Sequence, residues 1–300
     1  MRIEYNQAAK QVIPFQSQEI FSFVEENAKD MDSKTVQSFG EEWEKFSSFT
    51  KEEIEKVGDE YFDILPSTLL NQKSYVLDVG CGTGRWSKYL ADKVGFIECI
   101  DPSDAIFSAK HLLRQNDNVR ITKASVGNIP FGDNTFDLVM SIGVLHHIPN
   151  THQGIKVCID KVKKGGYFYV YLYYNLDNRG KLYRLLFDLS TLIRRLISNL
   201  PSFIKKIACD LIAFFVYVPL VFFGVITKII FGNVYKKLPL SYYVGKSLNI
   251  IRNDALDRFG TPLEKRYSKQ QINQILKEAG LTNIQFSENP PYWHVIGQKK

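Results

Sequence analysis

The spacing of apolar residues divides the chain into parts of different character. Residues 19–29 and 51–65 repeat apolar side chains at helical spacing, so they predict two helices within an N-terminal helical cap at residues 1–70. From residue 74 onward, short apolar runs typical of buried strands alternate with amphipathic runs typical of helices. The predicted strands are residues 74–79, 96–100, 119–123, 136–141 and 166–173, and the predicted helices are residues 85–94, 103–115 and 154–161.

This alternation predicts an α/β fold, because parallel strands need crossover connections, which helices usually supply. We expect a Rossmann-like, mostly parallel sheet in residues 71–177. Residues 251–300 are expected to complete the same sheet after an interruption.

Two local signals shape the C-terminal part. Ser268, with Gln271 three residues later, has the pattern of a capping box and predicts the start of a helix, which Gly280 ends. Residues 283–287 and 294–298 then predict two strands. Because two prolines separate them, we expect a terminal antiparallel hairpin.

The interruption, residues 178–250, predicts a hydrophobic and basic helical insertion. Its first half is amphipathic. One helical face carries the aliphatic residues Leu182, Leu185, Leu186, Leu189, Ile193, Leu196, Ile197 and Leu200, and the other carries Arg184, Asp188, Thr191, Arg195 and Ser198.

The second half of the insertion is more apolar. Residues 211–227 carry no charge and would form about 25 Å of helix, somewhat short of a bilayer core. Pro219 lies in their middle and is expected to kink or break the helix. Strands of one sheet flank the insertion, so a single membrane span is excluded. A re-entrant hairpin with its apex near Pro219, an interfacial helix pair and a soluble helical cap over the active site remain as alternatives.

Charge is unevenly distributed along the chain. Residues 1–70 contain seven basic and fifteen acidic side chains, whereas residues 178–240 contain ten basic and two acidic ones. A basic segment rich in aliphatic side chains favours an anionic membrane over nucleic acid. We therefore expect peripheral or re-entrant membrane contact through residues 181–237 and no nucleic-acid partner.

The N-terminus and the cysteines indicate the cell compartment. The first residues are polar and lack the pattern of a signal peptide. The four cysteines show no paired spacing, so neither a metal site nor a disulfide framework is expected. These features predict a cytoplasmic protein, and peripheral attachment at the inner face of the membrane is compatible with them.

A glycine-rich turn is the candidate cofactor-binding segment. The segment VLDVGCGTG at 76–84 reads as a strand, a tight turn and the start of a helix. A side chain at Gly80 or Gly82 would fill the space of a nucleoside cofactor, and Gly84 would permit close helix–strand packing. Asp101 closes the next strand, where its carboxylate can accept hydrogen bonds from both ribose hydroxyls; Glu98 lies mid-strand and suits this role less. The turn alone also fits a nicotinamide cofactor.

The extended pattern resembles class I S-adenosylmethionine (SAM) dependent methyltransferases of the methyltransferase domain 11 type. The matching segments are VLDVGCGTG at 76–84, IDPS at 100–103, NIPFGDNTFDLVMSIGVLHHIP at 128–149 and KKGGYFYV at 163–170. The resemblance covers residues 70–175 and the terminal hairpin. The layout, with SFGEEW before this region and NDALDRFGTPLE after the insertion, also resembles bacterial methyltransferases associated with surface-polysaccharide pathways.

The resemblance implies SAM as cofactor, S-adenosylhomocysteine as product and no metal. The glycines would line the cofactor, Asp78 would reach its amino group and Asp101 its ribose. Ser125 stands where the family often has an aspartate that contacts the adenine amine, so the backbone of Val126 is an alternative contact. The implied cofactor-binding residues are Asp78, Gly80, Cys81, Gly82, Gly84, Asp101, Pro102, Ser125, Val126, Ser141 and Ile142.

Candidate catalytic and substrate-binding residues are less well defined. His146 or His147 could accept a proton from a hydroxyl acceptor, although packing of the loop that they occupy is the favoured explanation. Tyr173, Tyr174 and Asn175 follow the last predicted parallel strand and are candidate substrate contacts, as is Trp43. Residues 254–267 read as a charged connector, either a solvated loop or an acceptor-recognition loop.

These features predict an enzyme that moves a methyl group to an unidentified acceptor by in-line displacement. The basic, apolar insertion favours a lipid-linked or amphipathic acceptor, such as a glycan precursor or a quinone-like molecule. The alternative is a membrane-associated, methyltransferase-like scaffold with weak or no catalysis. A nicotinamide-dependent oxidoreductase is a third interpretation of the glycine turn.

Overall fold

The computed structural model describes residues 2–16, 18–25, 28–45, 50–177 and 180–300, without the side chains of residues 41–45 and 182. The chain forms two compact units. The core unit comprises Met1–Asp177 and Leu263–Lys300, and the helical unit comprises Asn178–Pro262. The insertion therefore extends to residue 262 rather than to residue 250, because the helix α9 (Leu248–Gly260) belongs to it.

The core unit is built on a nine-stranded mixed sheet in the order β1-β2-β5-β4-β3-β6-β7-β9-β8. Its five central strands are parallel. They are β3 (Tyr75–Val79), β4 (Phe96–Asp101), β5 (Val119–Lys123), β6 (Phe136–Ile142) and β7 (Val162–Tyr171). The chain order reverses between β3 and β6, which is where doubly wound sheets form their binding sites.

The terminal hairpin is confirmed. Strand β9 (His294–Lys299) pairs antiparallel with both β7 and β8 (Leu281–Phe286). Helix α10 (Lys269–Glu278) begins with the predicted capping box of Ser268 and Gln271. The predicted Rossmann-like fold class, a mostly parallel sheet that ends in an antiparallel hairpin, is therefore confirmed.

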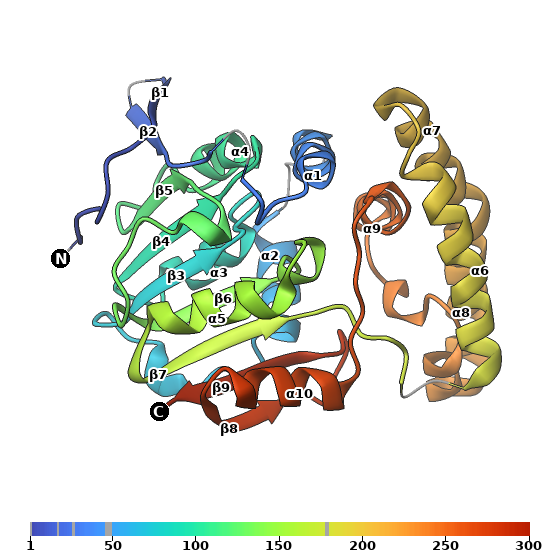
Figure 1. Ribbon diagram of the computed structural model, residues 1–300. Coiled ribbons are helices and arrows are strands. Elements are labelled where there is room, and N and C mark those ends of the chain that lie inside the picture. Colours follow the sequence, from blue (N-terminus) through green and yellow to red (C-terminus); the bar gives the residue numbers. More distant parts are fainter. Residues whose placement is uncertain (1, 17, 26–27, 46–49, 178–179) are drawn as a thin grey trace. The chain divides into compact units, whose positions relative to one another are not determined.

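Helices cover both faces of this sheet (Figure 1). Buried residues of α5 (Thr151–Lys161) and α10 pack against one face. Buried residues of α3 (Arg85–Ala91) and α4 (Ala105–Leu112) pack against the other. The parallel strands are thus buried on both sides, which explains why their sequences are nearly continuous apolar runs.

The predicted helix at residues 19–29 is wrong. Strand β2 (Gln18–Ser22) pairs antiparallel with β1 (Gln11–Phe15), and a single parallel bridge joins it to β5. Ile20 and Phe23 are fully buried. These two residues are three positions apart, a spacing that also fits one face of a helix. At the edge of the sheet both side chains are buried too, and the backbone of β2 finds hydrogen-bond partners in its neighbouring strands. The helices of the N-terminal region are α1 (Ser33–Lys45) and α2 (Lys51–Tyr61), with a 3₁₀ turn at Ser67–Leu69.

The helical unit contains α6 (Lys181–Ile197), α7 (Ser202–Ile212), α8 (Val218–Phe231) and α9. The predicted break at Pro219 is wrong, because a π-helical turn at Ala213–Tyr217 joins α7 to α8 in one continuous helix. The N–H of Val218 donates to the carbonyl of Ala213, five residues back. This wider turn accommodates a residue without an N–H, so the chain does not reverse there and a re-entrant apex near Pro219 is excluded.

The continuous helix is unusually apolar. Together with the 3₁₀ turn that follows it, it spans the 36 residues Ser202–Lys237, and within the described chain it alone is long and apolar enough to cross a membrane. This finding concerns length and composition only. A further 3₁₀ turn, Ser241–Tyr243, precedes α9.

Candidate active site

The glycine turn between β3 and α3 has a backbone conformation that glycine adopts more easily than other residues. Gly80, Gly82 and Gly84 have φ angles of 77°, 54° and 79°, a left-handed region that favours glycine. The N–H groups of Gly80 and Cys81 both donate to the carbonyl of Ile100, at 2.8 and 3.0 Å. These bonds fix the turn against the end of β4.

Two of these glycines also permit close packing. A Cβ at Gly80 would lie 2.5 Å from the side chain of Val144, so Gly80 permits packing against the loop after β6. A Cβ at Gly84 would lie 2.6 Å from Leu113 and 3.2 Å from the Cβ of Ala109. Gly84 therefore permits close packing against α4 and the residue that follows it, instead of the predicted helix–strand contact.

Asp101 braces the turn from the end of β4. Its Oδ2 accepts from the N–H of Gly82 at 2.9 Å, and its Oδ1 accepts from the N–H and the hydroxyl of Ser103 at 2.8 and 2.6 Å. Burial raises the pKa of Asp101, and the hydrogen bonds from Ser103 and Gly82 oppose the rise. A carboxylate offers about four acceptor positions, so binding both ribose hydroxyls requires the Ser103 hydroxyl to rotate away. This role of Ser103 was not predictable from the residue pattern at the end of the strand.

Asp78, in β3, is fully buried. Its Oδ2 accepts from the hydroxyl of Ser87 at 2.7 Å, whereas its Oδ1 has no hydrogen-bond partner among the described residues. Burial raises the pKa of Asp78 to about 7; the hydrogen bond from Ser87 opposes the rise, and the charge of Asp101 adds to it. An unsatisfied buried acceptor is costly, so this oxygen is suited to receive a donor from a ligand.

Ser125 lies two residues after the end of β5, and Ser141 is the residue before the last one of β6. Ser125 is 1% exposed, and its hydroxyl has no hydrogen-bond partner within the described parts of the chain. The N–H of the preceding Ala124 donates to the carbonyl of Asp101, so the end of β5 lies beside the end of β4. The hydroxyl of Ser141 donates to the carbonyl of Val79 at 2.9 Å and joins β6 to β3. Ser141 therefore has a structural hydrogen bond in addition to its predicted backbone role.

The remaining predicted cofactor residues lie around the same strand ends. Pro102 is half-buried after β4, and Val126 and Ile142 are buried after β5 and at the end of β6. Cys81 is buried in the glycine turn, and its thiol pKa is raised by the neighbouring Cys99 and by burial. A thiol with a raised pKa stays protonated at neutral pH.

These groups fit a nucleoside that carries an amino-acid tail. The turn supplies close backbone approach, Asp101 supplies a carboxylate for ribose, Asp78 offers a vacant oxygen to an ammonium group, and Ser125 offers a vacant hydroxyl to an adenine. A neutral hydroxyl such as that of Ser125 accepts a weaker hydrogen bond from an amine than a carboxylate does.

The two adjacent histidines occupy a 3₁₀ turn, Leu145–His147, after β6. His146 is fully buried, and neither of its ring nitrogens has a hydrogen-bond partner among the described residues. Its ring centroid lies 3.9 Å from that of Tyr173 and 4.0 Å from that of His147. Burial lowers the pKa of His146 well below its ordinary value, with the charges of His147 and Arg266 adding to the effect, so the ring is neutral.

His147 has a defined hydrogen-bond partner. Its Nδ1 lies 2.7 Å from the carbonyl oxygen of Leu263. A carbonyl only accepts, so Nδ1 carries a hydrogen, and in the neutral form of this ring the lone pair lies on Nε2. The ring of Phe39, in α1, contacts His147 edge-on at 4.9 Å.

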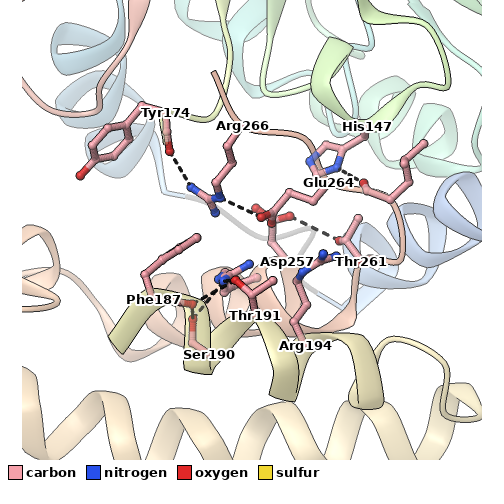
Figure 2. Close-up of polar contacts among 12 residues, drawn as sticks. His147, Tyr174, Phe187, Ser190, Thr191, Arg194, Asp257, Thr261, Glu264 and Arg266 are labelled. Atoms are coloured by element: carbon pink, nitrogen blue, oxygen red, sulfur yellow. Dashed lines mark hydrogen bonds and ion pairs between the residues drawn. The ribbon is translucent and has the colours of Figure 1, made fainter. Parts of the chain in front are cut away.

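Residues 263–267, which follow the helical unit in sequence, contact this turn and the residues that follow β7 (Figure 2). The N–H of Lys265 donates to the carbonyl of His146, and its ammonium donates to the carbonyls of residues 148 and 149. Arg266 pairs with Glu264 at 2.8 Å, donates to the carbonyl of Tyr174 at 3.1 Å and lies 4.9 Å from the ring of Tyr173. The prediction of one loop over residues 254–267 is therefore wrong: residues 254–260 are helical, and residues 263–267 hydrogen-bond within the core unit.

The predicted substrate contacts do not form one cluster. Tyr173 lies against His146, but Tyr174 packs against Tyr292 and Trp293 near the opposite face of the sheet. Asn175 donates its N–H to the carbonyl of Tyr267 and accepts from the N–H of Asp177 through its side chain. Successive residues after a strand point to opposite sides, which separates the two tyrosines. The side chain of Trp43 lies outside the described residues.

Comparison with known proteins shows which family the site region is similar to. The family described as "Methyltransferase domain" matches residues 77–170. The chain is similar to a ubiquinone biosynthesis O-methyltransferase of Coxiella burnetii, with 29% identity over 31% of this chain and 40% of that protein. It is also similar to a demethylmenaquinone methyltransferase of Geobacillus, with 35% identity over 30% of this chain and 41% of that protein. The chain thus spans about two fifths of the length of these curated relatives.

The fold also has structural neighbours. A solved SAM-dependent methyltransferase of Thermotoga maritima superimposes with a TM-score of 0.44 and 16% identity, over 87% of this chain and 94% of that one. Similarity at this level carries no argument about activity. The matched residues 77–170 contain the glycine turn, Asp101, Ser125 and the histidine turn, so the family match and the site geometry concern the same residues.

Proposed function

We propose, on the premise that residues 77–170 belong to the class I SAM-dependent methyltransferases, that this chain transfers a methyl group from SAM to an amphipathic acceptor and releases S-adenosylhomocysteine. The observation that carries the proposal is the pair of buried, unsatisfied acceptors, Asp78 Oδ1 and Ser125 Oγ. Asp78 lies in β3, and Ser125 lies just after β5. Asp101 ends β4, the strand that lies between these two in the sheet. Unsatisfied buried polar atoms are uncommon, and here both match donors that SAM carries.

The proposed roles of the residues follow from their contacts. Asp78 binds the ammonium group of the amino-acid tail, Asp101 binds the ribose, and Gly82 keeps the backbone clear where the tail passes. When bound, SAM supplies an electrophilic methyl group on a sulfonium. The protein contributes mainly by aligning the acceptor with that methyl group, because positioning alone can supply a large part of such a rate enhancement.

A hydroxyl acceptor also needs a base, and the histidine turn is where we place it. His147 has the better defined geometry, since the carbonyl of Leu263 fixes its tautomer and leaves Nε2 with a lone pair. His146 is neutral and supports the ring of Tyr173. We therefore assign His147 as the base for a hydroxyl acceptor and His146 as a residue that packs the site.

We propose a quinone-like or lipid-linked acceptor. Two relatives are named for ubiquinone and menaquinone methylation, and both quinones are apolar molecules with a polar ring. A lipid-linked glycan precursor has the same amphipathic chemistry. The apolar character of the helical unit supports this class of acceptor over a small polar metabolite. Comparing lipid extracts of a deletion strain and its parent by mass spectrometry tests it, because the account expects a lipid in the deletion strain that lacks one methyl group.

The alternative is a scaffold that does not bind SAM. The neutral Ser125 favours it, since this residue weakens the adenine contact. Calorimetric titration with SAM and S-adenosylhomocysteine separates the two functions. Binding of both ligands supports the enzyme, and absence of binding by the folded protein supports the scaffold.

A further inference from the structure

The helical unit carries its apolar side chains on the outside. In α6, a stripe of side chains at helical spacing is exposed, namely Leu185, Leu186, Leu189, Leu192, Ile193 and Leu196. The face that α6 buries carries Arg194 and Ser198 together with Ile197. An amphipathic helix of a water-soluble unit normally shows the reverse arrangement.

Polar contacts hold α6 against α9 (Figure 2). The guanidinium of Arg194 is 7% exposed and donates to the carbonyls of Thr261 and Pro262, both at 3.0 Å. Arg258 of α9 donates to the hydroxyls of Ser190 and Thr191, both at 2.9 Å. These bonds use the polar side of α6 for packing inside the unit, which leaves the leucine stripe facing outward.

The long helix formed by α7 and α8 repeats this arrangement. Its buried face contains polar and small residues along with a few apolar ones, namely Lys205, Cys209, Ala213, Tyr217, Val221, Gly224 and Thr227. Asp210 pairs with Arg252 of α9 at 3.0 Å. Phe203, Phe215 and Ile229 of the other face are 75%, 76% and 78% exposed.

The exposed large apolar side chains are concentrated in this unit. Of the 25 that are exposed in the described residues, only Val12 and Leu70 lie in the core unit. Exposed apolar surface that is both extensive and contiguous marks an interaction site, whereas single residues do not. We define the exposed apolar residues of α6, α7, the π-helical turn and α8 as the apolar face.

The charge of the helical unit indicates what covers this face. Residues 178–262 contain thirteen basic and four acidic side chains. Basic side chains are exposed at both ends of the helices, namely Lys181, Arg184, Arg195, Lys228, Lys236 and Lys237, whereas Asp188 is the one exposed acidic side chain described in the unit. Apolar side chains bordered by basic ones complement a bilayer with anionic headgroups.

We propose that the apolar face inserts into one leaflet of an anionic lipid bilayer, with α6, α7 and α8 in the plane of the membrane. The unit does not cross it. Strands β7 and β9, which pair in one sheet, flank the unit in sequence, so the chain enters and leaves on the same side. Helix α6 exposes Arg184, Asp188 and Arg195, so it is too polar to span a membrane. If the continuous helix of α7 and α8 crossed the membrane, no second spanning helix would return the chain to the side on which it entered.

Vesicle flotation of the full-length chain tests this docking. The probes are vesicles of phosphatidylcholine alone and of phosphatidylcholine with about 30% phosphatidylglycerol. The wild type is expected to float with both and more strongly with the anionic vesicles at low salt. A variant with Leu196→Gln, Phe203→Gln, Phe215→Gln and Ile229→Gln should lose roughly tenfold or more in partitioning. The matched control, Val12→Gln with Leu70→Gln, changes exposed apolar residues of the core unit and should partition as the wild type does.

A second pair of variants tests the charge. Lys236→Glu with Lys237→Glu should weaken binding to anionic vesicles roughly tenfold or more and leave binding to neutral vesicles unchanged. Lys73→Glu with Lys164→Glu, exposed lysines of the core unit, is the matched control. Circular dichroism checks that each variant keeps its helix content, and the charge variants keep the test valid if the apolar-face variant fails to fold.

Several outcomes overturn the proposal. One is a wild type that stays soluble at low salt and is monodisperse without detergent. Another is a wild type that does not bind vesicles but forms a dimer, which the apolar-face variant abolishes. The apolar face would then be covered by a second copy of the chain. Resistance of the bound protein to alkaline carbonate extraction would indicate a crossing helix instead. A SAM titration of the same preparations keeps this result separate from the proposed function, because vesicle binding does not require the cofactor.

Discussion

Asp78 provides a quantitative prediction, because its carboxyl is buried with one vacant oxygen and a pKa raised to about 7. Only the ionised carboxylate pairs well with an ammonium group. With a pKa of about 7, the ionised fraction falls roughly tenfold between pH 8 and pH 6. SAM affinity of the wild type should therefore fall about tenfold over this range, equivalent to about 1.4 kcal/mol.

The substitution Asp78→Asn removes the titrating group and keeps the shape. At pH 8 it should weaken SAM binding by about 1.5–3 kcal/mol, the usual contribution of a hydrogen bond to a charged group. Its affinity should not change between pH 6 and pH 8. Calorimetry in two buffers with different protonation enthalpies measures both effects, since the wild type should release a proton on binding near pH 6. A wild-type affinity independent of pH, or the same pH dependence in Asp78→Asn, would show that the Asp78 carboxylate does not bind the ammonium group of SAM.

Stability should change in the opposite direction. The folded-state pKa of Asp78 lies above its ordinary value of 3.8, so the folded state binds more protons between about pH 4 and pH 7. The contribution of this group is therefore fully present below pH 4 and is lost as pH rises through 7, with a magnitude on the order of 4 kcal/mol. Asp78→Asn should unfold at a higher temperature than the wild type at pH 8, and a lower unfolding temperature would contradict the assignment.

Three further changes test the site. Gly82→Val places a β-branched residue at a φ of 54° and should abolish SAM binding, as measured by calorimetry, while circular dichroism shows a folded protein. Asp101→Ala should weaken SAM binding by about 1.5–3 kcal/mol and also lower the unfolding temperature, because the N–H of Gly82 loses its partner; an unchanged unfolding temperature would argue against this bracing role. For a hydroxyl acceptor, His147→Asn should lower turnover roughly a hundredfold with unchanged SAM affinity, and His146→Asn less; similar turnover in all three proteins would leave positioning as the whole mechanism.

The parallel core could be predicted because its strands are buried on both faces. Continuous apolar runs such as VLDV and the turn glycines that follow leave few alternatives, so the order and approximate bounds of β3 to β7 followed from the sequence. The position of Asp101 at a strand end followed too. Its contact with Ser103 did not, because a side chain two residues away can point in several directions after a strand.

The errors arose where one pattern fits two structures. Ile20 and Phe23 suit a helix by spacing, and the partner strand that decides otherwise lies elsewhere in the sequence. Pro219 normally disrupts a helix, but a π-helical turn before it removes the conflict. In α6, periodicity correctly identified an apolar stripe, yet it could not show that Arg194 faces inward, because that depends on the carbonyls of Thr261 and Pro262.

The most direct test of the central claim is a calorimetric titration of the wild type and of Gly82→Val with SAM, S-adenosylhomocysteine and NADH. We expect saturable binding of SAM and S-adenosylhomocysteine to the wild type, loss of both in Gly82→Val, and no binding of NADH. A folded wild type that binds neither SAM nor S-adenosylhomocysteine, or that binds NADH in their place, would contradict it.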